Sequence, residues 1–202
     1  MQHALFNPEK VNNLLPKDGV VEIYPDFFTR PECEILLQYL KTEIEWNQDR
    51  MKFYGKEVNL PRLTAWYGEP MKEYSYSGIK MKVKPWTNEL LFIKERIEKN
   101  AGIKFTSVLL NLYRNGNDSV SWHRDNEKVL KVNPIIASVS FGATRTFKFR
   151  HIDDHSLIRT VELTNGMYVL MKEETQHKWE HTIPKTSKEV QPRISLTFRI
   201  LF

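Results

Sequence analysis

The stretch Ser107-Val108-Leu109-Leu110-Asn111-Leu112-Tyr113 is dominated by aliphatic residues and begins the part of the sequence that decides the fold. Five further short stretches rich in β-forming residues follow it: Ile135–Phe141, Thr146–Arg150, Thr160–Leu163, Met167–Met171 and Arg193–Ile200. Turn signals punctuate this region at Asn115-Gly116, Asn133-Pro134 and Asn165-Gly166. Many short strands separated by turns predict two packed β-sheets, as in a sandwich or jelly roll.

A helix is predicted upstream, after a short strand within Val20–Phe28. Its start is marked by Thr29, which can cap, by Pro31 in the first turn, and by Glu32 three residues after Thr29. Apolar residues then follow at helical spacing. They are Ile35, Leu36, Tyr39, Leu40 and Ile44.

A second helix is predicted from Thr87 to Asn100, ending at Asn100-Ala101-Gly102. Between the helices, Phe53-Tyr54-Gly55-Lys56 has the character of a hairpin tip, with glycine at a turn position. We therefore predict an α+β fold with a double-stranded β-helix (jelly-roll) core braced by N-terminal helices. The length of 202 residues fits one domain, spanning residues 1–202.

Composition narrows the possible partners and metal sites. Hydrophobic residues make up 41% and charged residues 27%, as in an ordinary globular protein, and no apolar run is long enough to span a bilayer. The single cysteine, Cys33, rules out an internal disulfide and a cysteine-based metal site, so any metal must use histidines and carboxylates. No secretion signal is recognisable near Met1, and we expect a reducing cytoplasmic or nuclear location.

The net charge of +5 and the pI of about 9.2 favour a polyanionic partner such as nucleic acid. The same charge is also compatible with a mildly basic protein that binds no polyanion. We expect no membrane partner, and a monomer is the default expectation for the assembly.

His123-Arg124-Asp125 is the motif with the strongest chemical character. In an extended segment, residues two apart point the same way, so His123 and Asp125 can bind one ion together. A third ligand must come from farther along the chain, where His177 and His181 are both candidates. Two histidines and one carboxylate form the ligand set of non-haem Fe(II) oxygenases. Taken alone, however, a His-x-Asp pair also occurs by chance at protein surfaces.

The segment from Arg193 to Arg199 alternates polar and apolar residues. As a strand it would place both arginines on one face with Thr197, where guanidinium groups can pair with a dicarboxylate. Asn111 and Tyr113 share one face of their own strand and could complete such a pocket. The alternative is an edge strand whose arginines lie in solvent.

Several sequence blocks, in order, resemble the AlkB family of nucleic-acid dealkylating dioxygenases, closest to the branch of eukaryotic nuclear homologues. The matching blocks, within roughly Tyr54 to Phe202, are Pro61–Gly68, Tyr74–Gly78, Asn111–Asn115, Asp118–Asp125, Pro134–Arg145 and Arg193–Arg199. Any one block would be weak, but their combination in the correct order is specific.

The resemblance implies Fe(II) as cofactor, with 2-oxoglutarate and O2 as co-substrates. It implies that the catalytic iron ligands are His123, Asp125 and His181, in preference to His177. The implied cofactor-binding residues, which contact 2-oxoglutarate, are Asn111, Tyr113, His181, Arg193, Thr197 and Arg199. The expected activity is oxidative demethylation or dealkylation of N-alkylated bases, such as 1-methyladenine and 3-methylcytosine, in DNA or RNA. It would repair alkylation damage.

Substrate contacts are also implied. They fall at Tyr54, Gly55, Lys56, Trp66, Tyr74, Ser75, Tyr76, Asn126 and Glu127. By this comparison residues 1–104 carry the helices and a nucleotide-recognition hairpin and lid, and residues 105–202 carry the jelly-roll core. Close relatives often have Asp then Glu after the metal pair, whereas this chain has Asn126 and Glu127. The alternatives are an Fe(II)/2-oxoglutarate hydroxylase with a non-nucleic-acid substrate, or a nucleic-acid-binding module with an inactive jelly roll.

Overall fold

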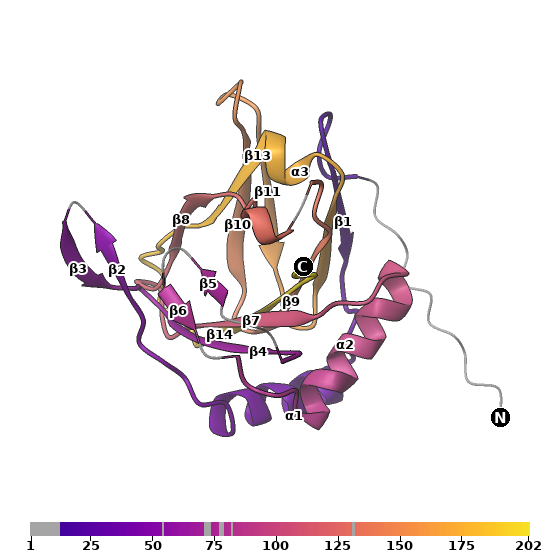
Figure 1. The fold of residues 1–202 in the computed structure, drawn as a ribbon, viewed down its shortest axis with the longest axis vertical. Helices are drawn as coiled ribbons and strands as arrows, with labels where there is room; N and C mark the ends of the chain where they lie inside the picture. The colour runs from indigo at the N-terminus through magenta and orange to yellow at the C-terminus, as the bar shows by residue number, and fades with distance from the viewer. Residues whose placement is uncertain (1–12, 54, 71–73, 77–78, 82, 131) are drawn as a thin grey trace.

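The fold, obtained as a computed structural model, is described for residues 13–53, 55–70, 74–76, 79–81, 83–130 and 132–202 (Figure 1). Its larger sheet has six antiparallel strands in the order β1-β12-β9-β14-β7-β4. In that order they span Val20–Tyr24, Tyr168–Lys172, Ile136–Gly142, Arg193–Arg199, Ser107–Tyr113 and Leu63–Gly68. Strand β14 lies between β9 and β7, where Thr197 pairs with Ser138 on one side and Leu109 on the other.

The smaller sheet has four antiparallel strands in the order β11-β10-β13-β8. In that order they span Ile158–Leu163, Arg145–His151, Trp179–Ile183 and Val120–His123. Side chains from the inner faces of both sheets form one buried cluster, in which Val169 and Met171 of β12 join Phe147 and Phe149 of β10. The two sheets therefore pack face to face.

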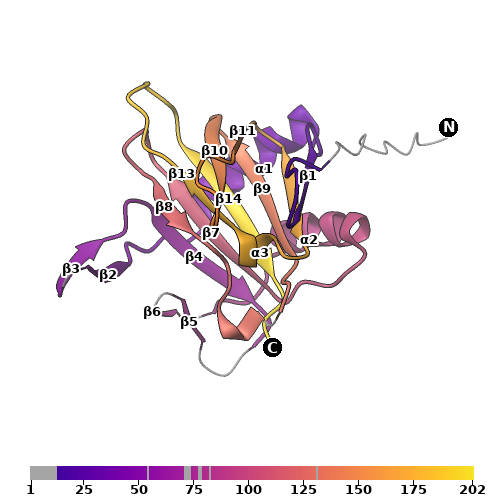
Figure 2. The same cartoon turned by 90° about the horizontal axis from the view of Figure 1, so that it is seen from above.

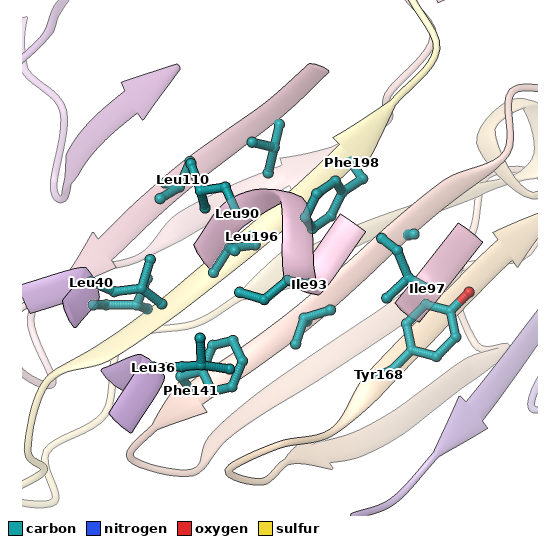
Figure 3. Close-up of a cluster of buried hydrophobic side chains, with 14 of the residues drawn as sticks. Leu36, Leu40, Leu90, Ile93, Ile97, Leu110, Phe141, Tyr168, Leu196 and Phe198 are labelled. Atoms are coloured by element: carbon teal, nitrogen blue, oxygen red, sulfur yellow. The ribbon is translucent and has the colours of Figure 1, made fainter. Parts of the chain in front are cut away.

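Two helices cover the outer face of the larger sheet, α1 (Arg30–Thr42) and α2 (Asn88–Ala101) (Figures 1 and 2). Their buried side chains pack on the outward residues of the strands. Figure 3 shows Leu36, Leu40, Leu90, Ile93 and Ile97 beside Leu110, Phe141, Tyr168, Leu196 and Phe198. The larger sheet is thus buried on both faces, against helices on one and against the smaller sheet on the other.

Side chains in the sequence cap the starts of both helices, and a glycine ends the second. At the start of α1, the Glu32 carboxylate accepts the backbone N–H of Thr29 at 2.7 Å. At the start of α2, the Thr87 hydroxyl accepts the N–H of Leu90 at 3.3 Å. Helix α2 ends at Gly102, whose φ of 71° lies in the left-handed region that glycine favours.

Two hairpins and one short helix complete the description. The first hairpin joins β2 (Arg50–Phe53) to β3 (Lys56–Asn59), and both views show it projecting from the body of the molecule (Figures 1 and 2). The second joins β5 (Tyr74–Tyr76) to β6 (Ile79–Met81). The one-turn helix α3 (Thr175–Lys178) leads directly into β13.

The observed elements confirm the two predicted helices, the Phe53–Lys56 hairpin and all six of the predicted downstream strands, with ends shifted by one or two residues. Strands β4, β8 and β13 lie in segments for which no strand was assigned. Strands β1 and β4, from the N-terminal half, belong to the larger sheet. Among the residues that the structure describes, no helix has both the length and the apolar character that crossing a membrane requires.

Candidate metal centre and surrounding pocket

Three side chains from two segments of the chain meet between the two sheets. His123 ends β8 and pairs in register with His181 of β13, and their rings lie 4.3 Å apart. Asp125 lies two residues beyond the end of β8. One ligand atom from each of the three residues lies within 4.8 Å of the others. The predicted donors are therefore brought together by the pairing of β8 with β13.

The electrostatics of the group suit a divalent cation. Burial would raise the pKa of Asp125, but the adjacent Arg199 guanidinium, together with His181 and His123, outweighs this and lowers the pKa to about 2. Burial, together with the charge of His123, lowers the pKa of His181 to about 3, and burial also lowers the pKa of His123. The donors at neutral pH are therefore one carboxylate and two neutral imidazoles, which is the set that a divalent iron ion requires.

Hydrogen bonds orient these donors. His123 Nδ1 lies 2.8 Å from the carbonyl oxygen of Ser121, which can only accept, so Nδ1 carries the proton and Nε2 is left for a metal. Arg199 Nη2 donates to Asp125 Oδ1 at 2.8 Å, and both side chains are almost fully buried. His181 is 4% exposed, and no described residue hydrogen-bonds to its Nδ1. The geometry and the protonation states both fit a bound iron.

A polar strand face continues the pocket away from the donors. Because β14 is pleated, Arg193, Ser195, Thr197 and Arg199 point between the sheets, while Ile194, Leu196 and Phe198 point to the helices. On the neighbouring strand β7, Asn111 and Tyr113 lie opposite Ser195 and Arg193. The residues predicted to bind 2-oxoglutarate line the same pocket as the metal donors. They are Asn111, Tyr113, His181, Arg193, Thr197 and Arg199.

The two arginines of β14 have different environments. Arg199 faces the Asp125 carboxylate, whereas Arg193 has no carboxylate within ion-pair distance among the described residues. Arg193 is 1% exposed, donates through Nη2 to the hydroxyl of Ser140 at 2.7 Å, and lies 5.3 Å over the ring of Tyr113. Burial lowers its pKa to about 10, so it remains charged at neutral pH. A buried cation of this kind fits an anionic ligand, such as the distal carboxylate of a dicarboxylate.

Arg62 is one of the pocket residues that the sequence reasoning missed. Arg62, which precedes β4, lines the pocket and is 6% exposed. Its Nε donates to the side-chain oxygen of Asn111 at 2.8 Å, and its Nη1 donates to the carbonyl of Ser119 at 3.2 Å. A single arginine before a strand carries no periodic signal, so only the three-dimensional contact identifies it.

The alternative metal ligand His177 lies outside the donor group formed by the described residues. It belongs to α3, and its Nε2 accepts the backbone N–H of Asn133 at 3.2 Å. The preference for His181 that the resemblance implied therefore agrees with the geometry.

The structure describes only some of the hairpin residues that were predicted to contact a base. Tyr54 lies outside the described residues. Gly55 and Lys56 are exposed at the tip of the β2–β3 hairpin, where Gly55 has a φ of 78°. Tyr74, Ser75 and Tyr76 form strand β5, for which the structure describes the backbone.

The other predicted base contacts differ from one another in burial. Trp66 is 1% exposed and belongs to the cluster between the sheets, so its ring contributes packing and has no surface left to offer a base. Asn126 is exposed just beyond Asp125. Glu127 is half-buried, burial raises its pKa, and its Oε2 has no hydrogen-bond partner among the described residues. Of these three residues, only Asn126 and Glu127 have surface beside the metal donors.

Comparison with known proteins identifies the family. A family model described as the 2OG-Fe(II) oxygenase superfamily matches residues 20–199. The chain is 41% identical to human "Alpha-ketoglutarate-dependent dioxygenase alkB homolog 3" over 210 residues, covering 94% of this chain and 73% of that protein. It is 34% identical to human "DNA oxidative demethylase ALKBH2" over 192 residues, covering 90% of this chain and 74% of that protein.

A solved structure, described as "The structure of OsALKBH1", is similar in fold, with a TM-score of 0.64 at 15% identity, covering 89% of this chain and 96% of that one. At this identity the likeness concerns the fold alone, but it agrees with the family match. The chain therefore belongs to the AlkB family within the 2OG-Fe(II) oxygenase superfamily, and it is an Fe(II)- and 2-oxoglutarate-dependent dioxygenase that uses O2.

Proposed function

We propose that this protein repairs alkylated DNA or RNA by oxidative demethylation or dealkylation of bases such as 1-methyladenine and 3-methylcytosine. The observation that carries the proposal is a complete donor set, with Asp125 and His181 buried, in a chain 34% identical to a protein named DNA oxidative demethylase. The greater identity to an alkB homolog 3 supports the same chemistry. The net charge of +5 suits a polyanionic substrate.

In this proposal His123, Asp125 and His181 hold Fe(II). Iron, with 2-oxoglutarate and O2, supplies the oxidation of an alkyl C–H bond, after which the alkyl group leaves as an aldehyde and the base is restored. Arg199 keeps Asp125 ionised and oriented through their 2.8 Å contact.

The rest of the pocket is proposed to hold 2-oxoglutarate. Arg193 pairs with the carboxylate far from the metal, because this buried cation lines the pocket and its Nε and Nη1 have no hydrogen-bond partner in the described chain. Asn111, Tyr113 and Thr197 complete the polar wall around the co-substrate. The apolar residues Leu109 and Phe147 line the same pocket and help to exclude water.

A base inside a duplex cannot reach a buried iron, so the target must be flipped out or already single-stranded. The β2–β3 hairpin, with Gly55 and Lys56 at its tip, is proposed to contact the strand, and Lys56 suits a phosphate contact. Tyr54 is proposed to join this contact. The lid segment Tyr74–Tyr76 and the pair Asn126 and Glu127 are proposed to contact the base. Trp66 supports the pocket wall from within the core.

The two packed antiparallel sheets are proposed to form a double-stranded β-helix, or jelly roll, within a single domain of residues 1–202. Residues 105–202 would supply most of the core strands, and residues 1–104 the helices, hairpin and lid. We propose that the protein acts as a monomer in the cytoplasm or nucleus, where nucleic acid is found.

The test is a panel of oligonucleotides carrying 1-methyladenine or 3-methylcytosine, as DNA and RNA, single- and double-stranded. Each is incubated with protein, Fe(II), ascorbate and 2-oxoglutarate, and the methyl group is followed by mass spectrometry. We expect methyl loss on at least one member and none with His123→Ala. Succinate formation without methyl loss on any member would favour the alternative, a hydroxylase with a non-nucleic-acid substrate.

A further inference from the structure

Helix α3 makes a buried contact with the metal-donor segment that the family assignment does not explain. Gln176 of α3 is 0% exposed, and its side-chain Oε1 accepts the backbone N–H of Asp125 at 2.9 Å. The two residues are 51 positions apart in the sequence, and Gln176 lies five residues before His181. One amide side chain therefore connects the segment carrying Asp125 to the segment carrying His181.

Asp125 needs such an anchor because strand β8 ends at His123. From Arg124 to Leu130 the described chain forms no strand, and the N–H of Asp125 donates to Gln176 instead of to a neighbouring strand. Arg199 holds the Asp125 carboxylate from the other side. Asp125 is thus fixed twice, by Gln176 at its backbone and by Arg199 at its side chain.

The same helix contacts this segment at two more points. Arg124 Nη1 donates to the carbonyl of His177 at 3.2 Å, and the Asn133 N–H donates to His177 Nε2 at 3.2 Å. Both of these contacts are exposed to water, whereas the contact made by Gln176 is buried. Water can replace an exposed hydrogen bond but not a buried one, so Gln176 dominates the connection.

We propose that Gln176 is a positioning residue for the metal site, which presents the Asp125 carboxylate to a metal held by His123 and His181. The inference rests on the proposed role of these three residues as iron ligands. Residues that hold ligands from behind typically change metal affinity by ~10–100-fold when replaced. We therefore expect Gln176 to act on metal affinity more than on folding.

The test measures binding of Mn(II), an oxygen-stable substitute for Fe(II), by calorimetry without nucleic acid. Gln176→Met keeps the length of the side chain and removes the acceptor oxygen, and we expect it to weaken Mn(II) binding by ~10–100-fold. Gln176→Glu keeps an acceptor oxygen and should bind Mn(II) more tightly than Gln176→Met. His177→Ala, the matched control on the same helix, should stay within about twofold of the wild type, as for a surface substitution.

Thermal unfolding of the metal-free variants separates positioning from a merely structural role. Wild-type Mn(II) affinity in folded Gln176→Met overturns the proposal, and so does an equal loss in His177→Ala. If Gln176→Met does not fold, Gln176→Asn replaces it, since its shorter amide withdraws the acceptor from Asp125. Equal affinity of Gln176→Asn and Gln176→Glu then overturns the proposal.

The proposed ligands are tested separately with His123→Ala. If this variant binds Mn(II) as tightly as the wild type, the proposed metal site itself is wrong. If it loses Mn(II) binding while Gln176→Met does not, only the role of Gln176 fails.

Discussion

The two faces of strand β14 have almost equal burial but opposite chemistry. Ile194, Leu196 and Phe198 point outward and pack against helices α1 and α2. Figure 3 shows Leu196 and Phe198 on this face. Arg193 and Arg199 point inward into the pocket that also contains the metal donors, and both are almost fully buried. One strand therefore stabilises the fold with one face and builds the site with the other. The alternation of the pleat keeps the two tasks separate, so a substitution on one face should spare the other.

The largest effect is expected from His123→Ala, which removes one metal donor from the inner side of the pocket. Losing several kcal/mol of metal assistance lowers turnover on the order of 1000-fold or more, at 1.36 kcal/mol per tenfold. The free energy of unfolding without metal should change little, because His123 is half-buried and at a strand end. Succinate production measures the loss of turnover, and urea unfolding measures the free energy of unfolding.

Asp125→Ala tests the metal site less specifically than His123→Ala does. It leaves the Arg199 guanidinium buried without its carboxylate, so folding suffers as well as metal binding. A variant of His123 that kept full turnover would remove His123 from the site, whatever Asp125→Ala showed.

On the outer face, Leu196→Ala should lower the free energy of unfolding by about 2–5 kcal/mol through loss of contacts and a cavity. Leu196 is 0% exposed between β14 and the helices. The affinity of the folded protein for 2-oxoglutarate should be unchanged. Urea unfolding measures the change in stability, and calorimetry at low temperature measures the affinity for 2-oxoglutarate. A weakened affinity with unchanged stability would contradict the separation of the faces.

On the inner face, Arg193→Met should weaken the binding of 2-oxoglutarate without lowering stability, which is the opposite of the result expected for Leu196→Ala. Hydrogen bonds to a charged partner contribute about 1.5–3 kcal/mol, so the dissociation constant for 2-oxoglutarate should rise by ~10–150-fold. Without co-substrate, stability should stay equal or increase, because a buried cation has been replaced by an apolar side chain. The control is Lys41→Met, which removes an exposed cation from α1. An unchanged dissociation constant would exclude Arg193 from the carboxylate site.

The smallest effect is expected on the way in which the stability of the metal-free protein depends on pH. The pKa of His181 is lowered to about 3 in the folded state, from an ordinary value of 6.5. Between these values the unfolded chain binds one proton more than the folded chain, so stability is lost as pH falls from 6.5 toward 3, by up to about 1.4 kcal/mol per pH unit.

Asp125, whose pKa is lowered from 3.8 to about 2, adds to this loss only as pH falls below its ordinary value. Unfolding temperatures measured with a chelator between about pH 7.5 and 5 check the contribution of His181. His181→Leu should show a shallower loss, and identical slopes would mean that His181 is not held neutral. Leu196→Ala, with no titrating group removed, should keep the wild-type slope.

Local patterns were sufficient to predict much of this architecture. The alternation in Arg193–Arg199 predicted which side chains share a face. The capping chemistry of Thr29 predicted the start of α1 within one residue, and the helix predicted from Thr87 also starts within one residue of α2. Strand β13 was not assigned because Trp179–Ile183 is short and its β-forming residues are interrupted by Glu180 and His181. Its position also decides between His177 and His181, since α3 ends at Lys178.

Non-local contacts could not be read from the sequence. The pairing of His123 with His181, the ion pair of Asp125 with Arg199, and the bond from Asp125 to Gln176 each join residues more than 50 positions apart. The core position of Trp66 also follows from sheet packing, which a search for exposed aromatic residues cannot detect. Short-range periodicity sets which face a residue occupies, but not which distant residue it meets.

The central place of β14 also has a consequence for the order of folding. This strand follows all others in the chain, yet it lies between β9 and β7 in the larger sheet. Without it, β4-β7 and β1-β12-β9 have no strand to join them, and each of the two groups would keep an open edge. The sheet therefore closes only after β14 leaves the ribosome, and loop closure over long sequence separations makes this step slow. A nascent chain arrested before Arg193 would present two unpaired edges to chaperones.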